Sequence, residues 1–167
     1  MKKSIALDII SCLFVLLFLY TGIFKLMDPG SVRSSLFAAP LPLLHTWARF
    51  LAIAVPVLEV LIGLTLLLAT LKERPRYRQA GLYGATILMA LFVWFVGFML
   101  KYQPHLPCSC GGVIQQMNWH QHLYFNIGFT ALGILGIWLN SRVLKTSSHE
   151  ENDLSYYSGH YKIQKDA

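Results

Sequence analysis

Charged side chains are scarce in this sequence: only 13% of its 167 residues are Asp, Glu, Lys or Arg, while 55% are hydrophobic. A soluble domain carries about a quarter charged residues, so this composition disfavours a soluble protein. Apolar runs of about twenty residues predict an integral membrane protein, with the lipid bilayer as its first partner. Acidic residues are fewer than basic ones, 8 against 14. The basic residues lie mostly in loops and at the ends, so we interpret their excess as an orientation signal and expect no nucleic-acid partner.

Cysteine is also rare, and three residues are too few for a disulfide scaffold. Cys108 and Cys110 are separated by a single residue, which suggests local redox or metal chemistry. Cys12 lies in the first apolar run, in the half of the bilayer next to the cytoplasm in the topology derived below. We therefore expect Cys12 to be a small core residue and not a third redox partner.

Four apolar segments predict an all-α fold, an integral membrane four-helix bundle made by residues 1–145. They cover residues 5–24, 47–71, 80–100 and 123–139. The first is too long for a signal-peptide core and no cleavage site closes it, which favours an uncleaved anchor. Asp28-Pro29-Gly30 ends it, residues 32–38 allow a short amphipathic piece, and Asn118 is the predicted N-cap of the last helix. Residues 146–167 are polar and predicted to form a disordered cytoplasmic tail.

The Cys-x-Cys pair lies on the connection between the third and fourth predicted helices. Pro104 and Pro107 precede the pair and two glycines follow it, so the connection is predicted to be non-helical. Eight basic residues near the membrane share the side of the termini, against four on the other side: Lys2, Lys3, Lys72, Arg74, Arg76, Arg78, Arg142 and Lys145 against Lys25, Arg33, Arg49 and Lys101. This bias predicts a multi-pass protein of the bacterial inner (plasma) membrane with cytoplasmic termini and a periplasmic Cys-x-Cys loop. Paired thiols can stay oxidised in the periplasm.

The spacing of the two thiols favours redox chemistry. Bridged cysteines prefer an α-carbon separation of about 5.5 Å, which a one-residue spacer meets only with strain. Strain makes a disulfide labile and oxidising. The pair also precedes the start of the fourth helix, whose dipole favours a thiolate. His120 and His122 lie in the same region, and a protonated imidazole there would stabilise the thiolate further.

Two other interpretations of the pair remain open. Cys108 and Cys110 could form a passive staple, although a loop this short stabilises little. They could also bind copper or zinc together with His120 and His122, as a Cys-x-Cys and His-x-His set, although this spacing matches no strong motif. On the redox hypothesis no metal is required.

Glu59 is the other residue that requires an explanation, because it falls near the middle of the second span, where a charge is costly. It shares a helical face with Pro56 and Gly63. The candidate hydrogen-bond partners are Tyr20, Thr21 and Asn126. A functional interpretation is a proton relay or a contact to a quinone head group, so a quinone is a candidate cofactor, although none is certain. A structural one is an interhelical hydrogen bond that fixes packing.

The remaining charged and polar residues of the spans have simpler interpretations. Asp8 is expected to form a salt bridge with a residue of the basic link at 72–79. Lys25 and Arg49 are expected to be interface anchors. A polar stripe is predicted to point inward from the fourth helix, and it consists of His122, Asn126, Thr130 and Gly133.

Taken together, these motifs resemble the MauE branch of the DoxX-like membrane proteins. The resemblance is carried over residues 5–140 by the run 20–29 (Tyr-Thr-Gly-Ile-Phe-Lys-Leu-Met-Asp-Pro), the run 55–59 with Gly63, the Cys-Ser-Cys-Gly-Gly run at 108–112, Asn118-Trp119 and His122 to Asn126. It implies a four-helix membrane bundle with a redox-associated role. It also implies a role in maturation of the disulfide-rich small subunit of methylamine dehydrogenase, or of a similar exported client. Membrane thiol oxidases that pass electrons to quinone are similar in outline, but they carry a Cys-x-x-Cys pair and a second pair that this chain lacks.

The sequence therefore predicts a membrane thiol–disulfide oxidoreductase, or a redox partner of one. Cys108 and Cys110 would be the catalytic residues, with Cys110 slightly favoured as the attacking thiol. Glu59, His122, Asn126 and Lys25 are supporting candidates. The expected partner is an exported thiol or disulfide client, or a thioredoxin-like protein. The alternative is a non-enzymatic membrane assembly factor in which the thiols form a structural or metal clip.

Overall fold

The computed structural model describes residues 5–39, 41–102 and 118–165, with side chains described as far as residue 145. Five helices follow one another in this part of the chain, which contains no strand: α1 (Ile5–Met27), α2 (Pro29–Ala38), α3 (Pro42–Leu71), α4 (Pro75–Tyr102) and α5 (Trp119–Lys165). Four of them, α1, α3, α4 and the Trp119–Lys145 part of α5, are long and apolar enough to cross a membrane. The predicted all-α membrane bundle is thereby confirmed for the described residues.

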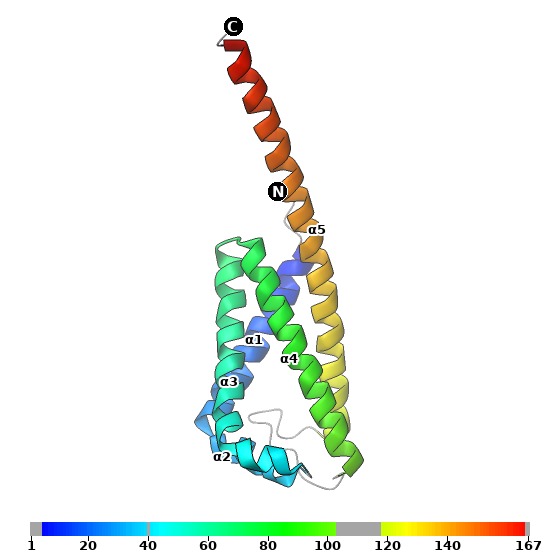
Figure 1. Ribbon diagram of the computed structural model, residues 1–167. Helices are drawn as coiled ribbons and strands as arrows, with labels where there is room; N and C mark the ends of the chain where they lie inside the picture. Colours follow the sequence, from blue (N-terminus) through cyan, green and yellow to red (C-terminus); the bar gives the residue numbers. More distant parts are fainter. Residues whose placement is uncertain (1–4, 40, 103–117, 166–167) are drawn as a thin grey trace.

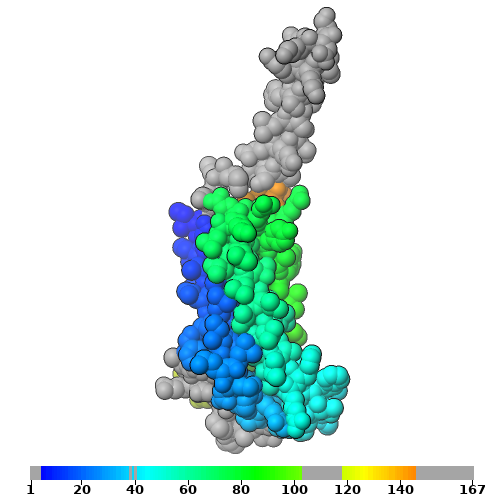
Figure 2. All heavy atoms as spheres, turned by 90° about the vertical axis from the view of Figure 1, so that its left-hand side faces the viewer, coloured from blue at the N-terminus to red at the C-terminus, as the bar shows by residue number. Residues whose placement is uncertain are grey.

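The four long helices run alternately up and down, and the short α2 lies across one end of the bundle (Figure 1). α1 packs mainly on α3, and α4 packs mainly on α5. Figure 2 shows α1 and α3 side by side along the height of the bundle. The core between the spans is made of large apolar side chains that are almost fully buried: Leu7, Phe14, Phe18, Leu66, Leu82 and Met89.

Local capping explains where several helices begin. The Asp28 side chain accepts a hydrogen bond from the Ser31 backbone N–H at 3.2 Å. α1 ends at Met27, as the Asp-Pro-Gly signal predicted, and α2 starts at Pro29, three residues before the short piece expected at 32–38. α3 starts at Pro42, five residues before the predicted Trp47, because proline is well tolerated in the first turn of a helix. At the start of α5 the Asn118 N–H donates to the Gln121 side chain at 3.0 Å, half of a capping box, which confirms the predicted N-cap.

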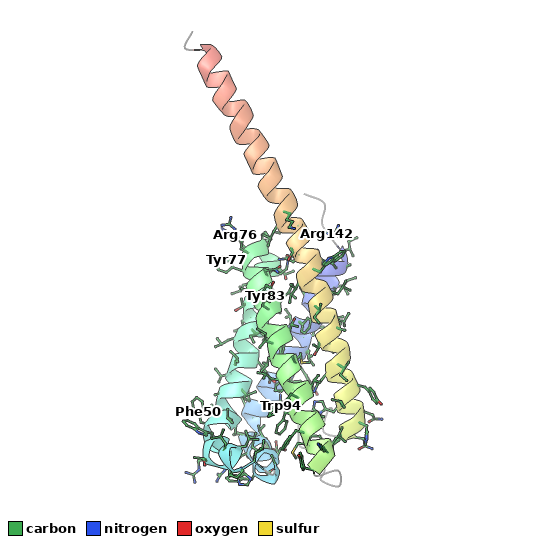
Figure 3. All side chains as sticks on the ribbon, turned by 45° about the vertical axis from the view of Figure 1, so that its right-hand side comes forward. Phe50, Arg76, Tyr77, Tyr83, Trp94 and Arg142 are labelled. Carbon is green, nitrogen blue, oxygen red and sulfur yellow. The ribbon has the colours of Figure 1, made fainter. Side chains whose placement is uncertain are left out.

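The bundle end that carries both termini holds a polar network. Arg78 donates to Asp8 at 2.8 Å and to the side chain of Asn140 at 3.0 Å. Asn140 is fully buried and donates in turn to Gln79 and to the Pro75 carbonyl. The network ties α1, α4 and α5 together and confirms the predicted salt bridge between Asp8 and the basic link. Figure 3 places Arg76 and Arg142 at this same end, and Phe50 and Trp94 nearer the end that carries α2.

Large apolar side chains are exposed over the whole length of the spans, among them Leu16, Leu61, Ile87 and Ile134. Such a surface suits a lipid environment, where an outward leucine costs nothing. Cys12 belongs to this outer surface of α1, so its prediction as a core residue is wrong. Lipid-facing and core-facing positions of a membrane helix are both apolar, and a small residue such as cysteine fits either of them.

α5 continues as a helix beyond the end of the bundle, to Lys165 (Figure 1). The composition of residues 146–167 had predicted a disordered tail, whereas the backbone is helical to that point. A helix satisfies its own backbone hydrogen bonds, so it can extend without packing partners from the bundle. The division of the chain at residue 146 and the cytoplasmic location of the tail stay predictions.

Candidate functional site

The bundle interior contains an ion pair between α1 and α3. Glu59 is completely buried, on the face of α3 that also buries Pro56 and Gly63, as the spacing of these residues predicted. The Lys25 ammonium, from the last turn of α1, lies 2.5 Å from one carboxylate oxygen of Glu59, and its side chain is only 13% exposed. It also lies 4.7 Å from the centre of the Phe92 ring on α4. A buried acid is thus matched by a buried base from a neighbouring span.

This pairing differs from the sequence prediction in two respects. Lys25 was expected to anchor the chain at the membrane interface, and that prediction is wrong because its side chain points into the bundle. The sequence predicted Tyr20, Thr21 or Asn126 as the hydrogen-bond partner of Glu59, whereas the partner in the structure is Lys25. The sequence contained evidence for this ion pair, because Lys25 and Glu59 carry opposite charges and lie in consecutive spans that contain few other charged residues. A buried carboxylate without a cation is costly, which favours the inward orientation of the lysine.

A small cavity with both apolar and polar side chains in its lining lies beside the ion pair. Its volume is about 30 Å³, and its lining is drawn from α1, α3, α4 and α5: Leu17, Phe18, Thr21, Lys25, Glu59, Met89, Phe92, His122, Phe125 and Asn126. Two buried polar atoms at this cavity, Glu59 Oε2 and Asn126 Nδ2, have no hydrogen-bond partner among the described residues. One is an acceptor and the other a donor. A cavity of this size has room for one water molecule.

The predicted inward stripe on α5 is confirmed. Asn126 is 2% exposed, Gly133 is buried, and His122 and Thr130 are half-buried on the same side. The Thr130 hydroxyl donates to the Asn126 carbonyl at 2.8 Å. Gly133 is required by close packing, because a Cβ at this position would clash with the Thr86 side chain of α4. The stripe brings His122 and Asn126 to the cavity that Lys25 and Glu59 border from the opposite side.

A second, larger pocket opens beside the first. It has a volume of about 380 Å³ and is apolar over nearly all of its lining, which comes chiefly from α2, α3 and α4: Val32, Ser35, Leu36, Leu44, Leu51, Val55, Leu88, Leu91, Phe92, Trp94, Phe95 and Val96. Lys25 and His122 complete this lining. Lys25, Phe92 and His122 border both pockets, so the larger apolar pocket meets the small cavity at these three side chains.

Cys108 and Cys110 lie outside the described residues, and their predicted role stays a prediction. The helices on either side of them are described: α4 ends at Tyr102 and α5 starts at Trp119, both at the bundle end that carries α2 (Figure 1). His122 is in the first turn of α5, so the two pockets are near the helix ends from which the cysteine-bearing connection departs.

The two histidines of the alternative metal set do not converge. His120 and His122 both belong to α5. Residues two positions apart in an α-helix are rotated by about 200° about the helix axis, so their side chains point to nearly opposite sides of the helix. Accordingly, His120 is exposed while His122 borders the pockets. Among the described residues, no three His, Cys, Asp or Glu side chains gather as a metal site would require. Arg49 is exposed near the start of α3, which agrees with its expected role as an anchor.

These observations define a class: an all-helical, multi-pass membrane protein with an acid–base pair and a small cavity between its spans. Within that class, the chain belongs to the family of the methylamine utilisation protein MauE, whose family model matches residues 3–139. The match covers α1 to α4 and α5 as far as Leu139. Comparisons with curated proteins and with solved structures gave no significant match.

Proposed function

We propose that this protein exchanges thiols and disulfides with exported proteins through Cys108 and Cys110. The observation that carries the proposal is that the buried Glu59, its partner Lys25 and the half-buried His122 line one cavity, near the helix ends that flank the cysteine-bearing connection. Buried titratable groups are expensive inside a membrane, and they commonly mark functional sites. A dithiol that cycles has to take up and release protons, for which such a cluster is suited. Membership of the MauE family supports the same role.

The exchange proceeds in two balanced steps. One thiolate attacks a sulfur of the client disulfide, forms a mixed disulfide and releases the other client sulfur as a thiolate. The second thiolate of the pair then attacks the mixed disulfide, which leaves the pair oxidised and the client reduced. The reverse sequence oxidises a client dithiol. Cys110 is the proposed attacking residue because it is nearer in sequence to the positive end of the α5 dipole. The family description makes an exported protein of methylamine utilisation a candidate client.

A trapped mixed disulfide tests this proposal. If one cysteine attacks and the other resolves, then Cys108→Ser or Cys110→Ser should accumulate a covalent adduct with an exported protein, because the resolving thiol is missing. Non-reducing gels and mass spectrometry of the adduct would identify the client. The matched control is Cys12→Ser, which should give no adduct since Cys12 lies on the outer surface of a span. Absence of an adduct from both variants, at normal protein levels, would contradict thiol exchange.

Thiol exchange with exported clients also requires that Cys108 and Cys110 lie on the outer side of the membrane, because such clients are found only outside the cytoplasm. The basic residues at 72–78 and 142–145 favour cytoplasmic termini. A membrane-impermeant maleimide applied to intact, reduced cells should therefore label Cys108 and Cys110 and spare Cys12. Labelling of the pair only after disruption of the inner membrane would reverse the topology and remove the proposed clients from reach.

A further inference from the structure

A third pocket, the basic pocket, lies at the connection between α3 and α4. Its volume is about 440 Å³, and it is lined by Thr65, Leu68, Ala69, Lys72, Arg74 and Tyr77. The connection is at the bundle end that carries both termini, where two membrane-spanning helices meet (Figure 1). We propose that the basic pocket binds the phosphate head group of an anionic phospholipid of the surrounding bilayer. This inference is independent of the proposed thiol exchange.

The backbone of this connection is held by a hydrogen-bonded helix end. Glu73 has a φ of 48°, in the left-handed region, and its N–H donates to the Thr70 carbonyl at 3.3 Å. The following N–H, that of Arg74, donates to the Ala69 carbonyl at 2.9 Å. These are the two bonds of a Schellman motif, which closes the C-terminus of a helix. They fix the backbone on both sides of Glu73, so the fold brings Lys72 and Arg74 to one pocket before any ligand is bound.

The charge of the basic pocket suits a phosphate. Lys72 and Arg74 are both exposed, and neither side chain forms an ion pair with another of the described residues. The described lining includes no acidic side chain. An ammonium and a guanidinium are the two groups that proteins use to bind phosphate, and the guanidinium can donate two parallel hydrogen bonds to it. Basic pockets between membrane helices commonly bind phospholipid head groups in this way.

The apolar part of the same surface favours a lipid over a soluble anion. Leu61, Thr65, Leu68 and Lys72 recur along α3 at spacings of four, three and four, so they share one helical face. Leu61 is 55% exposed and Leu68 is 51% exposed, and the Thr65 hydroxyl donates to the Leu61 carbonyl of its own helix. A phospholipid can lay its acyl chains along this face and its head group at Lys72. A soluble anion would leave the leucines uncovered.

Native mass spectrometry of the full-length protein, released from detergent micelles and titrated with dioleoylphosphatidylglycerol, tests the proposal. Binding should saturate at one tightly bound lipid per chain. Dioleoylphosphatidylcholine has the same chains without the net negative charge and should bind more weakly. Arg74→Gln should weaken phosphatidylglycerol binding about fivefold, the usual effect of one basic residue beside an anionic lipid. The Arg74 side chain is exposed, so the fold of this variant should be unchanged.

Arg76→Gln is the matched control. It removes the same charge two residues further along, from an exposed arginine that does not line the basic pocket, so the affinity should be unchanged. Equal weakening by both variants, or equal binding of the two lipids, would overturn the site and indicate general attraction to the membrane surface. Glycerophosphoglycerol, which is the head group without acyl chains, should not displace the lipid at comparable concentrations. Displacement would overturn the lipid assignment and indicate a soluble phosphodiester as the ligand.

Discussion

Replacing Lys25 by methionine should destabilise the folded protein by about 3–5 kcal/mol, the usual cost of removing one partner of a buried ion pair. The reason is that Glu59 is fully buried and Lys25 is the cation beside it. Methionine keeps the length and the apolar stem of lysine, so the lost packing is small. Reversible unfolding in mixed detergent micelles, followed by circular dichroism, would measure the change.

Two companion variants identify the cause. Glu59→Gln in the Lys25→Met background should recover much of the lost stability, because neither charge is then buried. Lys101→Met makes the same substitution at an exposed lysine of α4 and should change stability by less than about 1 kcal/mol. Equal destabilisation by the two lysine substitutions would contradict a specific contribution of the Lys25–Glu59 ion pair to the stability of the folded protein.

Glu59→Lys should have a larger effect still and prevent accumulation of folded protein. The substitution puts two ammonium groups where a carboxylate and an ammonium now lie 2.5 Å apart. A charge at the centre of a span already costs about 2.5–3.5 kcal/mol on insertion scales, and repulsion inside the bundle adds to this. The amount of monodisperse protein extracted from membranes, measured by size-exclusion chromatography with a fluorescent tag, is the readout.

The charge swap serves as the control for this variant. Lys25→Glu combined with Glu59→Lys restores an opposite-charge pair and should recover a substantial part of the yield, whereas Lys25→Glu alone should not. Glu59→Gln should keep the fold, because an amide can still accept a hydrogen bond from Lys25. Full tolerance of Glu59→Lys would contradict the buried placement of residue 59.

The helices were predictable from the sequence because membrane spans carry a strong local signal. Length and hydropathy identified the four spans, Asp28-Pro29-Gly30 marked the end of the first, and Asn118 marked the start of the last helix through its capping chemistry. The inward face of α3 followed from the spacing of Pro56, Glu59 and Gly63. The salt bridge of Asp8 with Arg78 was also predictable, because Asp8 lies at the end of its span that is next to the basic link.

Contacts between helices were harder to predict, because periodicity tells which face a residue occupies but not what it meets. Lys25 at the end of a span can point toward water or into the bundle, and only the packing of α1 on α3 decides between the two. The position of Cys12 was predicted wrongly, because the lipid around a span and the protein core are equally apolar. The two pockets were not foreseen at all, since they arise where four or five helices meet.

Equilibration of the Cys108–Cys110 pair against glutathione buffers of graded potential tests the central claim most directly. The free thiols would be quenched with a maleimide and counted by mass spectrometry, with Cys12→Ser protein used so that only the pair contributes. A redox-active couple should titrate between about −250 and −150 mV, the range of known thiol–disulfide exchange proteins, and well above the −300 mV typical of structural disulfides. A pair that stays oxidised in strongly reducing buffer, or one that never forms a disulfide, would contradict the proposed function.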